Sequence, residues 1–192
     1  MYYPLYQPVE LVRSADGMEA WSGYAAVFFD RSNPDTEAPI PGTRMRERIE
    51  NRRVFDELLR SGNRVDLLWS HNNELDLAST ANGTLSLSVD DKGLRFYAPF
   101  DPNDFTHLLV RSKLNKPGCV AGCSFGFLPE KFSMRKEGPY HVRTIDKIKS
   151  MSEISICNTR HGIAYKATSV ELRHELDLWE QTQERIKRLR AK

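Results

Sequence analysis

Residues 118–128 alternate between two kinds of side chain, and this alternation predicts a β-strand. One face of the strand is apolar and comprises Ala121, Cys123, Phe125 and Phe127. The other face is almost bare, because Ser124 lies between Gly122 and Gly126, each two positions away. Glycine has no Cβ, so a second backbone could approach the Ser124 hydroxyl closely. The pattern fits a nucleophile that a peptide can reach, and it also fits an idle serine in a strand with glycines at a bulge.

Several other short segments have strand patterns, whereas helical patterns are few. Strands are expected at residues 20–29, 65–69, 83–89, 94–100 and 148–156, with a further pairing of 132–134 and 141–145. Strands and helices do not alternate often enough for a doubly wound sheet. We therefore expect a mainly β fold with helices, arranged as a compact β-barrel surrounded by a few helices.

Two short helices are expected between these strands. Asn51 is placed to cap the first helix, which should end before Gly62. Asp101 is placed to cap the second, with Pro102 at its first position and an end near Leu114. Both helices are short, so the strands should dominate the core.

The last segment has a different pattern and predicts one long amphipathic helix at residues 169–192. Thr168 and Glu171 form a capping box. The apolar positions that follow are Leu172, Leu176, Trp179, Ile186 and Leu189. This helix could pack on its own domain or bind a partner, and its charged faces leave both open. Residues 1–19 are expected to be irregular, although residues 9–12 could form a short strand.

Composition narrows the class of protein. The 28 basic and 26 acidic residues give a net charge of +2, which provides no reason to expect binding to nucleic acid or a membrane surface. No apolar run approaches the ~20 residues of a membrane span, and the N-terminus lacks the features of a signal peptide. The three cysteines are poorly spaced for a disulfide framework and indicate a reducing compartment.

The predicted strand at residues 118–128 also contains the pattern G-x-S-x-G, at residues 122–126, which occurs in the nucleophile elbow of α/β-hydrolases. That elbow requires a helix directly after the serine, but Pro129 and a polar stretch without helical period follow here. An esterase of this class would also need its histidine after the serine, at His141, His161 or His174. The motif is present without its usual context.

Catalysis by a serine requires a base within hydrogen-bond reach and a group that orients the base. His71 is a candidate base because it follows an apolar strand and precedes Asn72 and Asn73, although it could be an ordinary turn residue. Glu153 is a candidate orienting acid because it lies inside the strand at 148–156, although it could face solvent at an edge.

A metal site is not expected. The three cysteines contain no C-x2-C pair, and Phe125 and Phe127 mark the face of Cys119 and Cys123 as core. The same apolar face should make the Cys123 thiol inert as a nucleophile.

Taken together, several segments resemble the prohead maturation proteases of tailed phages, which are relatives of the herpesvirus assemblins. Residues 22–28 look like the opening strand of that family, and residues 81–94 look like its hairpin. Trp69-Ser70-His71-Asn72 resembles the histidine motif, usually Asn-His-Asp, and departs from it on both sides of the histidine. Cys123-Ser124-Phe125-Gly126-Phe127 is similar to Met-Ser-Phe-Gly-Phe, and Met151-Ser152-Glu153-Ile154-Ser155 resembles Leu-x-Glu-Val-Ser.

The resemblance implies a serine endopeptidase domain at residues 20–168. Ser124 would be the nucleophile, His71 the general base and Glu153 the orienting acid. Gly122 and Gly126 would give the substrate backbone room, and no cofactor would be needed. Analogy with assemblins makes Arg160 a candidate oxyanion donor, and it offers His161 as an alternative third member of the triad.

The resemblance also implies the partners and the place of action. Members of the family cleave segments of the major capsid protein or the scaffold protein, and often themselves, inside the procapsid in the host cytoplasm. A homo-oligomer is compatible with this role. The alternatives are an inactive capsid-assembly protein of the same fold and an α/β-hydrolase-type esterase.

Overall fold

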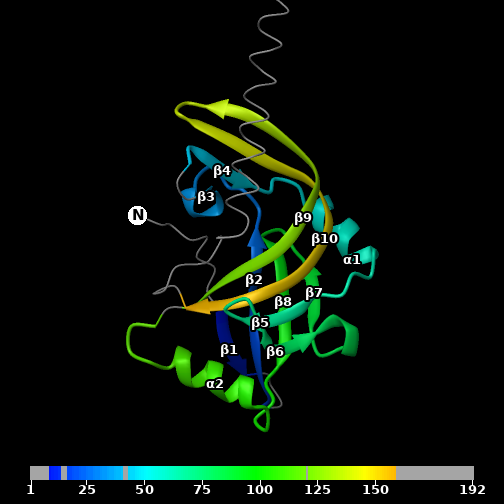
Figure 1. Ribbon diagram of the computed structural model, residues 1–192, viewed down its shortest axis with the longest axis vertical. Helices are drawn as coiled ribbons and strands as arrows, with labels where there is room; N and C mark the ends of the chain where they lie inside the picture. Colours follow the sequence, from blue (N-terminus) through cyan, green and yellow to red (C-terminus); the bar gives the residue numbers. More distant parts are fainter. Residues whose placement is uncertain (1–8, 14–16, 41–42, 120, 159–192) are drawn as a thin grey trace, which may run out of the picture.

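The computed structural model describes residues 9–13, 17–40, 43–119 and 121–158, and these residues form two β-sheets and two α-helices (Figure 1). The first sheet is antiparallel and has the order β1-β2-β8-β7. Its strands are β1 (Val9–Arg13), β2 (Glu19–Val27), β8 (Gly93–Pro99) and β7 (Ser86–Val89). The second sheet has the order β3-β4-β10-β5-β6, and β9 pairs with β10. Its strands are β3 (Ala38–Ile40), β4 (Met45–Arg48), β10 (Tyr140–Asn158), β5 (Asp66–Trp69), β6 (Asn72–Ser79) and β9 (Ala121–Glu137).

The expected mainly β fold is confirmed, but the expected closed barrel is wrong for the part of the chain described. The strands there form two separate hydrogen-bonded sheets. A barrel requires every edge strand to pair with another strand, and β1 and β7 each pair with a single strand. The two sheets pack through β2 and β9, which are in contact. The expected C-terminal helix at 169–192 lies outside the described residues.

The β9–β10 hairpin is the longest feature of the fold and curves along one side of the molecule (Figure 1). The sequence predicted four separate strands here, two of them paired as 132–134 and 141–145, and the structure joins all four into one hairpin that continues through Pro129. Four register irregularities bend the pair. Within the described residues β9 pairs with β10 alone, and proline, which cannot donate a main-chain hydrogen bond, is tolerated on such an edge strand.

Strand β10 organises the second sheet because it also pairs in parallel with two further strands. Its first half pairs with β4 and its last residues pair with β5. Helix α1 (Arg53–Arg60) packs against β10 through buried Val54, Phe55 and Leu58. The last residues of β10 are therefore fixed on both edges and on one face.

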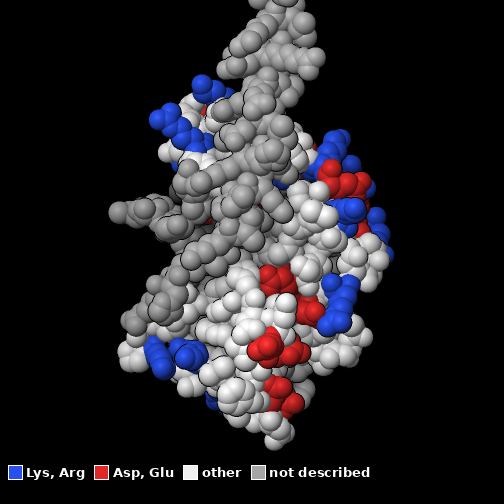
Figure 2. All heavy atoms as spheres, viewed as in Figure 1, with Lys and Arg blue, Asp and Glu red and all other residues white. Residues whose placement is uncertain are grey.

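Ion pairs fasten the far half of this hairpin to β4. The Arg48 side chain is almost fully buried and contacts carboxylates of Glu37 at 3.0 Å and Glu137 at 2.8 Å. Figure 2 shows groups of basic side chains near this end of the molecule and acidic groups lower on the same face. The end of the hairpin next to its turn is thus held to β4 by ion pairs as well as by main-chain pairing.

Both helices begin near the predicted positions, but their caps differ from the expectation. Helix α2 (Phe105–Leu114) is capped by Asp104, whose carboxylate accepts hydrogen bonds from the main-chain N–H groups of Thr106 and His107. Asp101, the expected cap, instead accepts from Asn103 in the preceding turn. Helix α1 starts after Arg52, and Asn51 accepts from the N–H of Arg53. Helix α2 therefore starts at Phe105, three residues after Pro102, which was predicted to be its first residue. Neither helix in the described part of the chain is long and apolar enough to cross a membrane.

His107 is buried and links helix α2 to both sheets. Its Nδ1 accepts hydrogen bonds from Trp21 Nε1 and from the N–H of Asp101, each at 3.2 Å. Its Nε2–H donates to the carbonyl oxygen of Leu77 at 2.7 Å. The neutral ring with its proton on Nε2 satisfies all three contacts.

We expect His107→Ala to lower the free energy of unfolding by about 2–4 kcal/mol, because it leaves a cavity and strands three buried polar groups. Urea denaturation followed by circular dichroism measures the effect. Ser112→Ala on the exposed side of the same helix is the matched control and should shift stability by less than about 0.5 kcal/mol. Equal stability of the two variants would contradict the structural role of His107.

Candidate active site

The registers of β9 and β10 place Ser124 and Glu153 on one face of the sheet. Ser124 lies opposite Ser155, and Gly126 lies opposite Glu153. Residues directly opposite each other in an antiparallel pair project to the same face, and so do residues two apart along a strand. The other face carries Phe125, whose side chain is in the core as the alternation predicted. The bare face of the serine strand is therefore also the face of the glutamate.

His71 reaches this face from a tight turn after β5, which pairs with β10 on the side away from β9. Ser70 and His71 both have left-handed backbone conformations, with φ of 53° and 61°. Such conformations cost on the order of 1–3 kcal/mol each in non-glycine residues. Two hydrogen bonds to β10 hold the turn: the Ser70 N–H donates to the Ile156 carbonyl oxygen, and the His71 N–H donates to Ser155 Oγ.

The His71 ring is oriented by Glu153. Its Nδ1–H donates to Glu153 Oε1 at 2.5 Å, and the Ser155 hydroxyl donates to Glu153 Oε2 at 2.7 Å. Because Nδ1 carries the proton, a neutral ring has its lone pair on Nε2. That Nε2 is buried and has no hydrogen-bond partner among the described residues. It is the atom that a general base needs to keep free.

Ser124 lies one strand away from this pair. Its side chain is almost fully buried, and within the described residues no hydrogen bond joins it to His71. The His71 ring interacts with Glu153 and Cys157, which lie on either side of Ser155 along β10. Ser155 itself lies opposite Ser124 on β9, so the ring and Ser124 are on neighbouring parts of the same face. Catalytic hydrogen bonds are often long before substrate binds.

The pKa values of the pair move in opposite directions. Interaction with the Cys157 side chain and hydrogen bonding to Glu153 raise the pKa of His71 to about 10, while burial opposes the rise. Burial raises the pKa of Glu153, but hydrogen bonds from His71 and Ser155 outweigh it and hold that pKa below its usual value. The pair therefore favours a carboxylate beside a ring that gains a proton readily.

Gly126 has a use that its sequence pattern did not reveal. A Cβ at this position would lie 3.0 Å from Glu153 Cγ and 3.1 Å from Glu153 Oε1. The space above Gly126 is therefore filled by the glutamate side chain. Gly122 is buried opposite Cys157, on the other side of Ser124.

The remaining candidates lie elsewhere. Arg160, His161 and His174 are outside the described residues. His141 is near the start of β10, next to Met45, while Ser124 pairs near its end. Ser124 lies within a continuous strand rather than in the sharp strand-to-helix turn of an α/β-hydrolase. Burial raises the pKa of the Cys123 thiol, which faces the core and is unsuited to be a nucleophile.

Sequence reasoning missed the contributions of Ser155 and Cys157 to this site. Both follow Glu153 at strand period, which was the available signal. Strand period alone would also put Met151 on the site face, but a bulge between Met151 and Glu153 turns its side chain into the core. The described residues contain no cluster of three or more histidine, cysteine or acidic side chains that could hold a metal ion.

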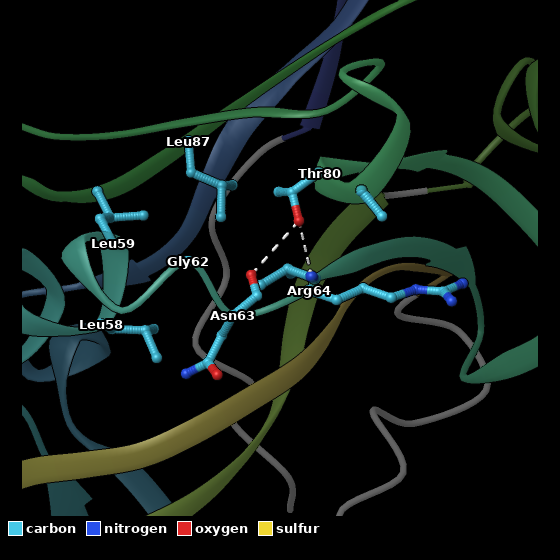
Figure 3. A pocket seen from close by; sticks show the side chains of 9 residues that line it. Leu58, Leu59, Gly62, Asn63, Arg64, Thr80 and Leu87 are labelled. Carbon is cyan, nitrogen blue, oxygen red and sulfur yellow. Dashed lines mark hydrogen bonds between the residues drawn. The ribbon is translucent and has the colours of Figure 1, made fainter.

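A cavity of about 350 Å³ lies at the opposite end of β5 from His71 (Figure 3). Leu58 and Leu59 line one side, and Thr80 bonds the backbone of Asn63 and Val65 across it. It contains neither Ser124, His71 nor Glu153. This cavity is therefore separate from the candidate active site.

Comparison with known proteins decides the family. A family model described as caudovirus prohead serine protease matches residues 8–182. The chain belongs to this family. Membership makes it a serine protease of phage prohead maturation and does not favour the inactive assembly protein or the esterase. No curated protein and no solved structure matches the chain.

Proposed function

We propose that Ser124, His71 and Glu153 are the catalytic triad of this prohead protease. The observation that carries the proposal is the Glu153–His71 hydrogen bond at Nδ1, which leaves the His71 Nε2 free on the face that also bears Ser124. A carboxylate that fixes the tautomer of a histidine beside a serine is the arrangement of serine proteases. The family shows the class of reaction, and the geometry supports this choice of residues.

The reaction follows from these positions. His71 Nε2 takes the proton of Ser124 as the oxygen attacks the scissile carbonyl carbon, and Glu153 stabilises the imidazolium that forms. The imidazolium then gives this proton to the leaving amine, the peptide C–N bond breaks and an acyl-enzyme remains on Ser124. Water, deprotonated by His71, hydrolyses the ester and restores the serine. Arg160 stays the candidate oxyanion donor by analogy alone.

The surroundings of Ser124 fit attack on a peptide backbone. Gly122 leaves one side of the serine without a side chain, and Gly126 leaves room for the acid on the other side. Glycine at position 122 leaves the fewest atoms for a substrate backbone to displace on this side of the hydroxyl, which is buried here.

The protease should be more active in alkaline than in neutral solution. General-base catalysis requires neutral His71, and its fraction rises with pH through the His71 pKa, which is raised to about 10. We expect the acid limb of kcat/KM to lie well above pH 6.5. Cys157→Ala removes one cause of the raised pKa, so the limb should move to lower pH and the rate at pH 7 should increase.

Rates between pH 6 and 10 for wild type, Cys157→Ala and the matched control Cys119→Ala measure this effect. Cys119 is a free cysteine with no assigned part in the site and should leave the profile unchanged. A wild-type midpoint near 6.5 that Cys157→Ala does not move would contradict the arrangement.

The substrates are proposed to be segments of the major capsid protein or the scaffold protein, cut inside the procapsid in the host cytoplasm. Co-expression of the protease with these two proteins of the same phage tests the proposal, with mass spectrometry of the products. New termini that appear with the wild type and not with Ser124→Ala are expected. Protease that assembles with uncut capsid and scaffold proteins would contradict it.

A further inference from the structure

Ser155 joins the two residues that assist the proposed nucleophile. It is fully buried on β10, between Glu153 and Cys157 along the strand. Its oxygen accepts the His71 main-chain N–H at 3.1 Å, and its hydroxyl donates to Glu153 Oε2 at 2.7 Å. One side chain therefore holds both the backbone of the base and the carboxylate of the acid.

These two bonds need a hydroxyl. A serine has one donor and two acceptor positions, and here it uses the donor on Glu153 and an acceptor on His71. Alanine would leave the His71 N–H without its partner in a turn whose backbone is left-handed. It would also free one carboxylate oxygen, so Glu153 could rotate about its terminal bond.

Gly126 limits the same carboxylate from the neighbouring strand. A Cβ there would come within 3.1 Å of Glu153 Oε1, the atom that bonds His71 Nδ1. The Glu153 carboxylate thus lies between two residues: the Ser155 hydroxyl bonds Oε2, and the missing side chain of Gly126 leaves space for Oε1. Both neighbours come from sheet positions that the register fixes.

We infer that Ser155 and Gly126 are positioning residues that hold Glu153 and the His71 turn in the geometry needed for proton transfer. The inference rests on the proposed triad. Both residues act through Glu153 and His71, so their loss should affect kcat and leave KM nearly unchanged. A displacement of about 1 Å can cost about 10²-fold in rate.

Kinetics of Ser155→Ala provide the first test. We expect kcat to fall by about 10- to 100-fold with KM within about twofold, because binding contacts remain. Ser155→Thr keeps the hydroxyl and should recover much of the rate. Ser150→Ala makes the same chemical change on the same strand, opposite Leu128 and outside the site, and should behave as wild type. A normal kcat for Ser155→Ala would overturn the inference.

Proton NMR gives a readout that does not depend on turnover. The hydrogen bond from His71 Nδ1–H to Glu153 should give a low-field resonance in the inactive Ser124→Ala protein. Adding Ser155→Ala should shift or broaden this resonance, whereas adding Ser150→Ala should not. An unchanged resonance in the Ser155→Ala protein would overturn the inference even if the triad is correct.

Gly126→Ala supports the test if Ser155→Ala fails to fold. Gly126 is on the site face and not in the core, and its new Cβ would push the carboxylate from Nδ1. The same loss of kcat and of the resonance is expected, and retention of both would contradict the inference. Full activity of Ser124→Ala would instead contradict the proposed triad. The NMR comparison would still test whether Ser155 holds the hydrogen bond between His71 and Glu153.

Discussion

Ser124→Ala is expected to reduce cleavage of the capsid or scaffold protein by about 10⁴-fold or more while the protein stays folded. The large loss follows because Ser124 supplies the oxygen on which the acyl-enzyme forms. The fold should persist because the Ser124 side chain makes no hydrogen bond within the described residues, and alanine fits the same space. Its main-chain pairing with Ser155 does not depend on the side chain.

The measurement is the rate of product formation, together with circular dichroism of each protein. Ser133→Ala is the matched control, since Ser133 is an exposed serine on the same strand. Its rate should equal that of the wild type. Near-normal processing by folded Ser124→Ala would remove Ser124 from the role of nucleophile.

Glu153→Gln is expected to lower kcat by about 10²- to 10⁴-fold. Glutamine has the shape of glutamate, but it is neutral, and its amide must reverse one of the two hydrogen bonds that the carboxylate accepts. If its oxygen accepts from His71 Nδ1–H, its NH₂ group faces the Ser155 hydroxyl, which donates in the wild type. If the amide turns round, the NH₂ group faces Nδ1 and favours the wrong tautomer. In either orientation the charge that stabilises the imidazolium is lost.

The pH profile of Glu153→Gln provides a second test, the direction in which the acid limb of the profile moves. Glu153 helps to raise the pKa of His71, so its neutral replacement should move the acid limb to lower pH. His161→Ala should cost about 10-fold or less if His161 only flanks the site. If His161→Ala has the larger effect, the third member of the triad is His161 rather than Glu153.

Local patterns predicted the elements of this fold better than their arrangement. The strand at Ser124 and the hairpin at residues 83–100 follow from side-chain alternation, and both are present. The predicted pairing of 132–134 with 141–145 is present in the far half of the β9–β10 hairpin. The continuous strands that carry it were not predicted, because many of their side chains are exposed and Pro129 interrupts the pattern. The expected barrel failed for another reason: closure depends on which edges pair over long distances, and side-chain period does not encode this.

The candidate site shows the same division. Ser124 had a local signal in its flanking glycines. His71 and Glu153 had weaker signals in their positions after and within predicted strands, and the resemblance singled them out. They are 82 residues apart in the sequence and meet only because β5 pairs in parallel with β10. The left-handed turn at Ser70 and His71 contains no glycine that would have signalled it. The part played by Ser155 depends on that turn and could not be seen without it.

Covalent labelling tests the central claim most directly. The protein is treated with a fluorophosphonate, which modifies activated serines, and the site of the adduct is found by peptide mass spectrometry. The proposed triad predicts one adduct on Ser124, absent from Ser124→Ala and strongly reduced in His71→Ala, with Ser133→Ala labelled as the wild type. No adduct on folded protein, or an adduct that remains on another residue in Ser124→Ala, would contradict it.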